Sequence, residues 1–511
     1  MIFDGMNLTT LYFFVFLLLA LLLYYALGRM QKYVLVLASI AFYFFISRSD
    51  AMFRVKLFVL MLFVAGVSYV GGLLIYRSQD TLKSVVTALC VLALVSILFY
   101  TKYAYNLFHL ISALLGRSDD LSFWKVAAVI GISYFNLSAI GYLIGVSWGL
   151  YPAERDPFIL TLFVFYFPQL ISGPVTRYPE MKAQFSERHS FDGNNIYLGI
   201  RRMLWGYFKK LVISERFALI VAAVYGDYEN YSGMAVLGAT LCYAVQLYTD
   251  FSGCMDIIMG TSQLFAIKLP ENFNAPFMSE SVQEFWQRWH ITLGTWFKDY
   301  VMYPMQKTAL MVKLGKYSRQ KLGKRLGKKL PFYLSMTVLW VLIGIWHGGT
   351  AYYFIASAVI PFCLLLFSDL LQPVYPKLVS VLHVNTECES WHWFRRGRTA
   401  LLICICWVFV CASGTLRAVG IMKHIFTRFV ICAPSTVSFE SFGLNTKDAV
   451  IMISGLMILF LADQVQYRGT SITEVMNRQN LLIRYGMICF EALCILAYGM
   501  VGSSSFIYFQ F

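Results

Sequence analysis

Long apolar runs separated by short polar segments extend along almost the whole chain. The first run, from Leu8 to Leu27, is long enough for a helix to cross the roughly 30 Å hydrocarbon core of a bilayer. No Lys or Arg precedes it, whereas a secretory signal peptide has a basic start and a shorter apolar stretch, so we expect a retained transmembrane helix. Further candidate spans lie at residues 34–47, 53–76, 84–100, 104–115, 123–148, 157–173, 199–224, 233–249, 251–267, 333–346, 350–371, 399–415, 447–463 and 485–501.

These runs predict an all-α polytopic protein of the cell membrane, with residues 1–511 forming a single domain. Several runs are too short or too polar to cross a bilayer completely, so we expect about ten to thirteen transmembrane helices together with re-entrant or interfacial segments. No succession of short alternating segments suggests a strand barrel. Composition agrees, because 59% of the residues are hydrophobic and 14% are charged, against about 45–50% and about 25% in soluble domains.

The net charge of +15 would suggest nucleic acid as a partner in a soluble protein, but it has another explanation in a membrane protein. In membrane proteins, basic residues gather in cytoplasmic loops facing anionic lipid, so nucleic acid is not expected as a partner. The densest cluster, at residues 307–329, contains nine Lys and Arg and no acidic residue. We predict a cytoplasmic loop that contacts membrane lipid, part of it an amphipathic surface helix. An additional role with an anionic donor stays open.

The sequence lacks the patterns typical of several metal, disulfide, nucleophile and nucleotide-binding sites. Most of the eleven cysteines lie in apolar runs, and Cys404 and Cys406 lack the spacing of a zinc site, so neither a metal nor a disulfide framework is expected. The G-x-S-x-G match at residues 145–149 is set aside because Ser147 ends an apolar helical run instead of a strand-to-helix elbow. The sequence has no P-loop, dinucleotide fingerprint or H-E-x-x-H motif.

Ionisable residues at bilayer depth are informative because they are costly to keep there. His347 ends the apolar run MTVLWVLIGIWHGG, residues 336–349. Desolvation favours a neutral imidazole, which can accept the proton of a hydroxyl that attacks an acyl carbon. Gly348 and Gly349 would let a substrate or another helix approach closely. Taken alone, His347 could equally be a buried histidine bonded to a carbonyl of another helix.

A second histidine lies in an aromatic and charged segment. His290 is part of SVQEFWQRWHITLGTWFKDYVMYP, residues 281–304, in which Glu284 and Arg288 are spaced to pair on one helix face. Such a segment is typical of an interface anchor or of a helix lining a wet cavity. Its aromatic and charged residues include Trp286, Trp289, Trp296, Lys298 and Asp299.

Two polar breaks interrupt the apolar pattern, at residues 167–180 and 270–277, and Asp250 and Asp256 lie close to the second. Irregular backbone at membrane depth is tolerated only where protein or a water-filled cavity covers it. The breaks therefore favour an internal chamber or tunnel, although each could be an ordinary loop.

The ordered phrases DFSG, PENFNAPF, EFWQRWHITLGTWFKDYV and WHGG, spread over residues 250–349, resemble the membrane-bound O-acyltransferases. They are most similar to the bacterial branch of alginate O-acetylation and teichoic acid D-alanylation. Residues 131–146, 165–174 and 204–216 and the final FIYFQF extend the resemblance over most of the chain. The sequence departs from the branch at Cys254–Met255, where a Tyr–Ser pair is common, and in its unusually basic loop before WHGG.

The resemblance implies a ring of helices around a central funnel, with catalytic His347 at the narrow point and His290 as a second, supporting histidine. It implies no bound cofactor and a cytoplasmic acyl thioester as donor, with acetyl-CoA favoured. The acyl group would pass to an extracytoplasmic acyltransferase or a small membrane partner, and then to a glycan. The motif residues expected to bind substrate are Trp346, Trp289, Arg288, Asp299 and Asn272.

The expected function is O-acetylation of an exported or cell-surface polysaccharide. D-alanyl transfer to teichoic acid is the nearest alternative, against which stand the more than 160 residues after WHGG and the FIYFQF ending. A proton-coupled transporter with relay histidines and a non-catalytic scaffold are alternatives of other classes.

Overall fold

The structure, a computed structural model, describes residues 7–46, 51–116, 131–348, 350–430 and 439–501. In these ranges the chain is built from helices and loops, and the only β pairing is an isolated bridge between Phe273 and Trp289. The chain divides into two compact units. Apart from the last few residues, unit 1 comprises Met1–Tyr207 and Cys254–Pro270, and unit 2 comprises Phe208–Gly253 and Glu271–Ser504.

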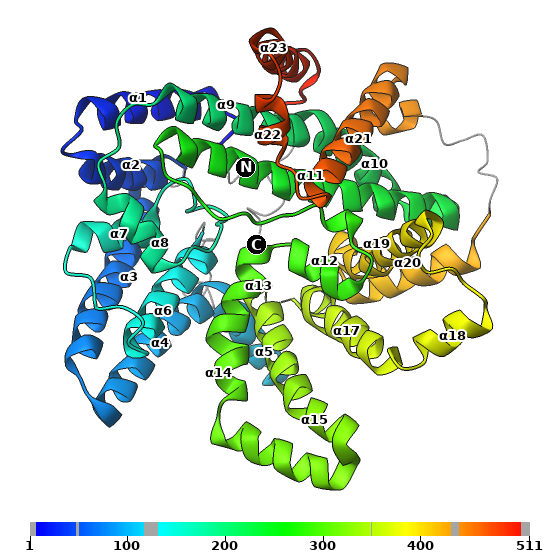
Figure 1. The fold of residues 1–511 in the computed structure, drawn as a ribbon, viewed down its shortest axis with the longest axis horizontal. Coiled ribbons are helices and arrows are strands. Elements are labelled where there is room, and N and C mark those ends of the chain that lie inside the picture. The colour runs from blue at the N-terminus through cyan, green and yellow to red at the C-terminus, as the bar shows by residue number, and fades with distance from the viewer. Residues whose placement is uncertain (1–6, 47–50, 117–130, 349, 431–438, 502–511) are drawn as a thin grey trace. The chain divides into compact units, whose positions relative to one another are not determined.

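Unit 1 contains the N-terminal helices and the last part of α11 (Figure 1). In it, α3, α4 and α6 pack against one another. The approach is close: a Cβ on Gly71 would lie 2.6 Å from the Cys90 Sγ, and one on Gly72 would lie 2.8 Å from the Tyr142 hydroxyl. The helices are α1 (Leu11–Ala26), α2 (Gln31–Ile46), α3 (Ala51–Arg77), α4 (Asp80–Lys102), α5 (Ala104–Leu114), α6 (Ile132–Ser147), α7 (Pro157–Phe165), α8 (Tyr178–Ser186), α9 (Gly193–Tyr207) and α11 (Gly233–Leu264).

Unit 2 contains the first part of α11 and the elements that carry both histidines of interest. Three of its segments, η2, η5 and η6, are π-helical, a rare geometry often found at functional sites. Its elements are η2 (Phe208–Ser214), α10 (Glu215–Gly226), η3 (Tyr228–Asn230), η4 (Pro276–Met278), α12 (Val282–Arg288), α13 (Ile291–Phe297), η5 (Lys298–Met302), α14 (Tyr303–Gln306), α15 (Ala309–His347), α16 (Ala351–Phe354), η6 (Ile355–Val359), α17 (Ile360–Leu371), α18 (Tyr375–Val381), α19 (Glu389–Ala412), α20 (Thr415–Thr427), η7 (Phe439–Phe442), α21 (Thr446–Tyr467), α22 (Ile472–Asn477) and α23 (Leu481–Tyr498).

Many of these helices present apolar surface that needs lipid. In α23, Leu482 is 85% exposed and Leu496 is 82% exposed, so water would be a poor solvent for this helix. The protein is therefore a multi-pass membrane protein, as predicted. Six helices in the described ranges are long and apolar enough to span a membrane: Arg54–Arg77, Asp80–Lys102, Gly327–His347, Ala351–Leu371, Thr446–Tyr467 and Leu481–Tyr498. Three further apolar helices are shorter: Leu11–Ala26, Gln31–Phe45 and Ile132–Ser147.

Two of the differences between the predicted and the observed helices change the architecture. The two spans expected at residues 233–249 and 251–267 form one helix, α11. The run at 157–173 gives only the nine-residue α7, because the chain leaves helical geometry at Tyr166. The predicted breaks are confirmed, since residues 166–177 and most of 265–281 are not helical. The ring, the funnel, the single domain and the total number of spans stay predictions.

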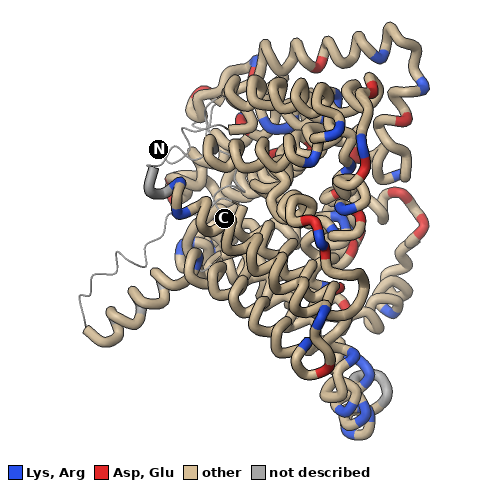
Figure 2. Tube along the Cα trace, turned by 90° about the vertical axis from the view of Figure 1, so that its left-hand side faces the viewer, with Lys and Arg blue, Asp and Glu red and all other residues tan. Residues whose placement is uncertain are grey.

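The basic segment at residues 307–329 is largely helical, as predicted. It forms the first part of α15, with a kink at Gly323, whose φ of 76° lies in the left-handed region that favours glycine. Figure 2 shows Lys and Arg gathered on the helices at the bottom of the view, where this segment lies. Lys329 pairs with Asp369 of α17 at 2.6 Å. Its position on the cytoplasmic side stays a prediction.

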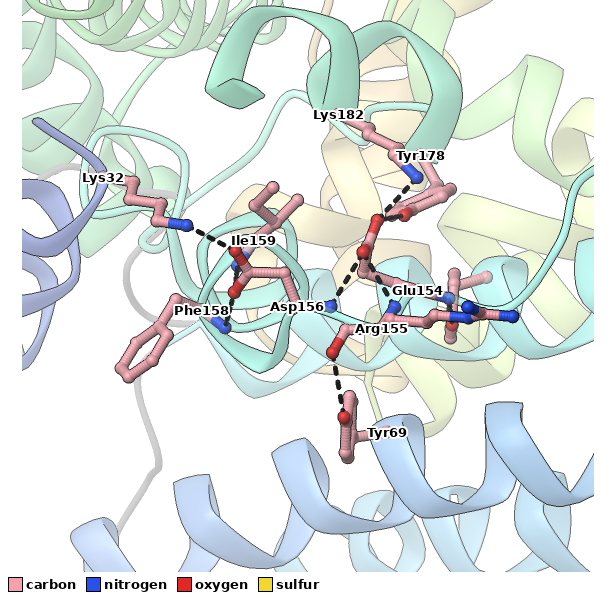
Figure 3. Close-up of polar contacts among 10 residues, drawn as sticks. Lys32, Tyr69, Glu154, Arg155, Asp156, Phe158, Ile159, Tyr178 and Lys182 are labelled. Carbon is pink, nitrogen blue, oxygen red and sulfur yellow. Dashed lines mark hydrogen bonds and ion pairs between the residues drawn. The ribbon is translucent and has the colours of Figure 1, made fainter. Parts of the chain in front are cut away.

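The start of α7 shows how polar residues in unit 1 shape the chain between apolar helices (Figure 3). The Asp156 carboxylate accepts hydrogen bonds from the backbone N–H groups of Phe158 at 2.9 Å and Ile159 at 3.4 Å, and Pro157 follows at the first helical position. Lys32 of α2 pairs with Asp156 at 2.5 Å. This cap ties the start of α7 to α2.

Glu154 is a buried carboxylate in the same loop, with its side chain 6% exposed (Figure 3). It accepts from the backbone N–H groups of Arg155 and Asp156, both at 2.8 Å, and from the Tyr178 hydroxyl, and it pairs with Lys182 at 2.8 Å. Burial alone would raise the pKa of Glu154, but the hydrogen bonds and Lys182 together lower it below its usual value. The charged form is therefore the one that the fold requires.

Replacing Glu154 by Gln should lower the free energy of unfolding in detergent at pH 7 by about 1–3 kcal/mol, because the Tyr178 hydroxyl and the backbone N–H groups of Arg155 and Asp156 lose a charged acceptor. The lowered pKa means that this stabilisation is complete above the unfolded carboxyl's pKa and is lost as the pH falls through the folded value. The wild-type advantage over Glu154→Gln should therefore shrink in acid. Thermal melts against pH measure it, with the exposed Glu187→Gln as control; an advantage that does not change with pH would contradict the assignment.

Candidate active site

His290 and His347 lie together in unit 2, although they are distant in sequence. Their ring centroids are 6.5 Å apart. The Trp346 indole contacts both, at 4.9 Å from the His347 ring and 6.1 Å from the His290 ring. His290 and Trp346 are buried and His347 is half-buried. The structure thus brings together two predicted catalytic residues and one predicted substrate-binding residue.

His290 lies in a backbone turn, and hydrogen bonds to a neighbouring segment of the chain hold this turn in place. Its φ of 49° and ψ of 50° place it in the left-handed region, which costs roughly 1 kcal/mol or more for a residue with a side chain. The Ile291 N–H donates to the Asn272 carbonyl, and the Asn274 N–H donates to the Arg288 carbonyl, both at 3.0 Å. These bonds on either side of the turn maintain the strained conformation.

The Asn272 side chain fixes the tautomer of His290. Its Oδ1 accepts from the Thr292 backbone N–H at 3.1 Å and from the Thr292 hydroxyl at 2.9 Å, which identifies that atom as the oxygen. The same oxygen lies 3.2 Å from His290 Nδ1, so Nδ1 must carry the hydrogen. The Nε2 of a neutral His290 is then the acceptor nitrogen.

Burial also sets the charge of His290, which lies in the turn between α12 and α13 and outside the candidate spans. Desolvation lowers the pKa of His290 well below its usual value, and the nearby His347 lowers it further. The site therefore holds His290 as a neutral imidazole at physiological pH.

His347 is the last residue of α15, one turn after a close helix contact. A Cβ on Gly344 would lie 2.6 Å from the Ala358 Cβ and 2.8 Å from the Phe354 ring, so α15 approaches α16 and η6 more closely there than any side chain allows. The Tyr353 ring lies 6.0 Å from that of His347. A Cβ on Gly348 would meet only Tyr353, at 4.0 Å, whereas Gly349 lies outside the described residues.

Aromatic rings line the other side of His290. Phe251 of α11 meets the imidazole edge-on, with centroids 5.0 Å apart and planes at 81°. Trp289 is stacked on Phe285 at 5.6 Å and contacts Trp407 of α19 at 5.4 Å. Trp289, predicted to bind substrate, is thus part of the aromatic cluster that packs beside His290.

Two adjacent lysines of η2 hold the residues on either side of Phe251. Lys209 donates to the Ser252 hydroxyl at 2.9 Å, and Lys210 pairs with Asp250 at 2.6 Å and with Glu215 at 2.7 Å. Both lysines are at most 4% exposed. Removing one member of such a buried pair typically costs about 3–5 kcal/mol because the other charge stays buried. Sequence reasoning missed these lysines, although their position within the apolar run 199–224 was a signal.

Two predicted substrate-binding residues make other contacts. Arg288 pairs with Glu284 at 2.9 Å, as its spacing predicted, and lies 4.7 Å from the Tyr467 ring centroid. Asp299 is exposed in η5. Their roles stay predictions. In the described ranges, no group of three or more His, Cys, Asp or Glu side chains could hold a metal ion.

Comparison with known proteins decides the family. The model of the MBOAT, membrane-bound O-acyltransferase family, matches residues 156–319. The chain is 30% identical over 473 residues to a probable alginate O-acetylase of Pseudomonas syringae pv. tomato, covering 90% of this chain and 82% of that protein. The chain belongs to the membrane-bound O-acyltransferase family. The family assignment made from its motifs is confirmed, and the protein is an O-acyltransferase.

Other relatives of this O-acyltransferase are named for a different polymer, and one of them for a different acyl group. A peptidoglycan O-acetyltransferase of Helicobacter pylori is 30% identical over 374 residues, covering 67% of this chain and 66% of that protein. A teichoic acid D-alanyltransferase of Bacillus subtilis is 28% identical over 299 residues, covering 56% of this chain and 68% of that protein. All three relatives are named for acylating a polymer.

The Gly344 contact yields a test of how His347 is positioned. Gly344→Ala should reduce acyl transfer and lower the free energy of unfolding by about 1–3 kcal/mol, because the new methyl group forces α15 away from η6. Gly238 of α11, whose Cβ would meet nothing within 4 Å, provides the matched control. Gly238→Ala should leave transfer unchanged and stabilise by about 0.5–1 kcal/mol. Equal activities in ester analysis of the two variants would contradict the close contact.

Proposed function

We propose that this O-acyltransferase moves an acetyl group from a cytoplasmic acyl thioester to a hydroxyl on the route to an exported or cell-surface polysaccharide. The observation that carries the proposal is the pairing of buried His290 with half-buried His347 around Trp346, in a family with relatives named O-acetylase and O-acetyltransferase. The donor would be acetyl-CoA or another acyl thioester, with no bound cofactor. An extracytoplasmic acyltransferase or small membrane protein would receive the acyl group.

In this mechanism His347 acts as general base. Its neutral imidazole removes the proton from the acceptor hydroxyl while the oxygen attacks the thioester carbonyl. The tetrahedral intermediate then collapses with cleavage of the C–S bond, and the imidazolium returns the proton to the thiolate. The negative end of the α15 dipole favours the transient imidazolium, because His347 is the last residue of that helix. Such proton transfer contributes about 10²–10⁴-fold.

His290 has a supporting role in the proposal. Asn272 holds the hydrogen on Nδ1 of His290, so the ring presents one fixed donor and one fixed acceptor nitrogen. With the Phe251 ring against it, the imidazole has little freedom to rotate. We expect this rigid ring to orient the acceptor or the donor carbonyl relative to His347, with Trp346 shielding the reacting groups from water.

Replacing His347 by Ala should lower ester formation at least about 100-fold, because the general base is lost. Cells carrying wild-type protein, His347→Ala or the exposed control His109→Ala would be compared by ester analysis of surface glycans, with the membrane fraction quantified in parallel. Acetyl esters that vanish only in His347→Ala support the proposal, whereas vanishing D-alanyl esters would replace the cargo. Unchanged esters of both kinds would remove His347 from the role of general base.

Replacing His290 by Asn should reduce ester formation by a smaller factor, about tenfold to 100-fold. Asn adopts the left-handed conformation more readily than most residues, so the turn is retained while the ring is lost. The same ester analysis measures the effect, and thermal melts in detergent check the fold. Wild-type activity in a folded His290→Asn protein would remove His290 from the site.

A further inference from the structure

Three arginines in the first turns of α19 converge on one residue of unit 2, Glu280. Arg395 lies 2.8 Å from Glu280 Oε2, and Arg396 lies 3.6 Å from Glu280 Oε1. Arg398 donates to the Glu280 backbone carbonyl at 2.9 Å. His392 adds a contact at 2.8 Å to Oε1. Glu280 precedes α12, which packs on α19 (Figure 1).

Positive charge is in excess around Glu280. Arg288, paired with Glu284, faces the same Tyr467 ring as Arg396, with guanidinium carbons 4.7 and 5.1 Å from its centroid. The four guanidinium groups share only the two carboxylates of Glu280 and Glu284, so these six groups together carry a net charge of +2, and Arg398 has no carboxylate among its described partners. The site is partly enclosed, since the Arg396 side chain is 11% exposed and that of Arg395 is 31% exposed. Such a charge imbalance favours an anion.

Hydrogen-bond donors are also in excess here. Within the described residues, Arg396 Nε and Arg398 Nε are buried and have no acceptor. Leaving buried donors unsatisfied costs free energy, most of all for charged groups. The Trp393 ring, 4.4 Å from the Arg396 guanidinium carbon, keeps that planar group oriented. The cluster thus offers fixed donors to an acceptor-rich ligand.

We infer that Arg395, Arg396 and Arg398 form a binding site for a phosphate-bearing group. Phosphate oxygens match the planar donor fork of arginine and carry the two negative charges that the cluster lacks. Arg395 and His392 are each 31% exposed and so leave a side open to solvent. The phosphate could belong to the carrier of the acyl thioester or to a lipid headgroup.

The course of the chain connects this cluster with the candidate active site. α19 also carries Trp407, which packs on Trp289 beside His290. At 1.5 Å per residue, Arg396 and Trp407 are roughly 17 Å apart along the helix axis. A carrier held by its phosphate at the cluster would need a flexible arm of that order to bring its thioester to the histidines.

The cluster also lies toward the end of α19 that is near the basic segment, and the cytoplasmic donor is expected on that side of the membrane. α17 ends at Leu371, close to Asp369, which pairs with Lys329 of the basic segment. The short exposed α18 follows, and α19 starts near the same end of α17, since the Tyr375 ring of α18 lies 6.5 Å from the Trp391 ring in the first turn of α19. The cluster and the basic segment therefore open to the same face. The donor source of the phosphate rests on the proposed function, whereas the phosphate site does not.

The test uses the full chain purified in detergent and needs no turnover. Coenzyme A and inorganic pyrophosphate are titrated separately, and retention of phosphatidylglycerol against phosphatidylcholine is measured by native mass spectrometry. The variant Arg395→Gln/Arg398→Gln should weaken its ligand at least about tenfold, since each charge-assisted bond is worth about that factor. Arg428→Gln, an exposed arginine at the end of α20, is the control.

Each outcome decides something. Weaker coenzyme A binding with unchanged lipid retention identifies the donor carrier, and the reverse identifies a lipid headgroup. Unchanged binding of all probes, or no binding by wild-type protein, overturns the site and leaves an ion network that only stabilises the fold. If the double variant does not fold, Arg395→Lys keeps the charge without the fork and should weaken binding severalfold. His347→Ala should bind coenzyme A like wild type, so a failure of the proposed chemistry is distinguished from a failure of this site.

Discussion

The hydrogen bonds between residues 272–274 and 288–291 are the constraint on which the candidate active site depends. They hold His290 in a left-handed conformation that a free chain would leave, and the Asn272 side chain adds a fixed tautomer. The turn sets both the position and the protonation of one imidazole. The position of the other imidazole, that of His347, depends on where α15 ends. The close contact of Gly344 with α16 and η6 fixes that position.

Buried charge is the second organising feature. The η2 lysines are satisfied by groups of α10 and α11, so that each costly charge also fixes the spacing of two helices. Phe251 lies between the two anchored residues and presses on His290. Ion pairs and ring packing thus act on the same few residues of unit 2.

The sequence predicted the enzyme family and the residues that lie together around His290 better than it predicted the helix boundaries. His290, His347 and Asn272 could be found because rare polar residues stand out against apolar runs and because their phrases are ordered. The single helix α11 could not be found, since Asp250 looks like a break until its partner Lys210 is known. The convergence on Glu280 is likewise a property of folded distance, because its arginines come more than one hundred residues later in the chain.

The lipid-facing helix α23 connects the bilayer mechanically to η2. None of the 18 residues of α23 is buried against the protein, yet its end is tied down: the Met500 N–H donates to the Leu211 carbonyl of η2 at 3.0 Å, and Arg216 donates to the Tyr498 carbonyl at 2.8 Å. A helix held at one end and surrounded by lipid tilts when the membrane thickens or thins. That tilt would pull directly on the π-helical turn beside the buried lysines, so membrane thickness becomes a physical variable of the enzyme.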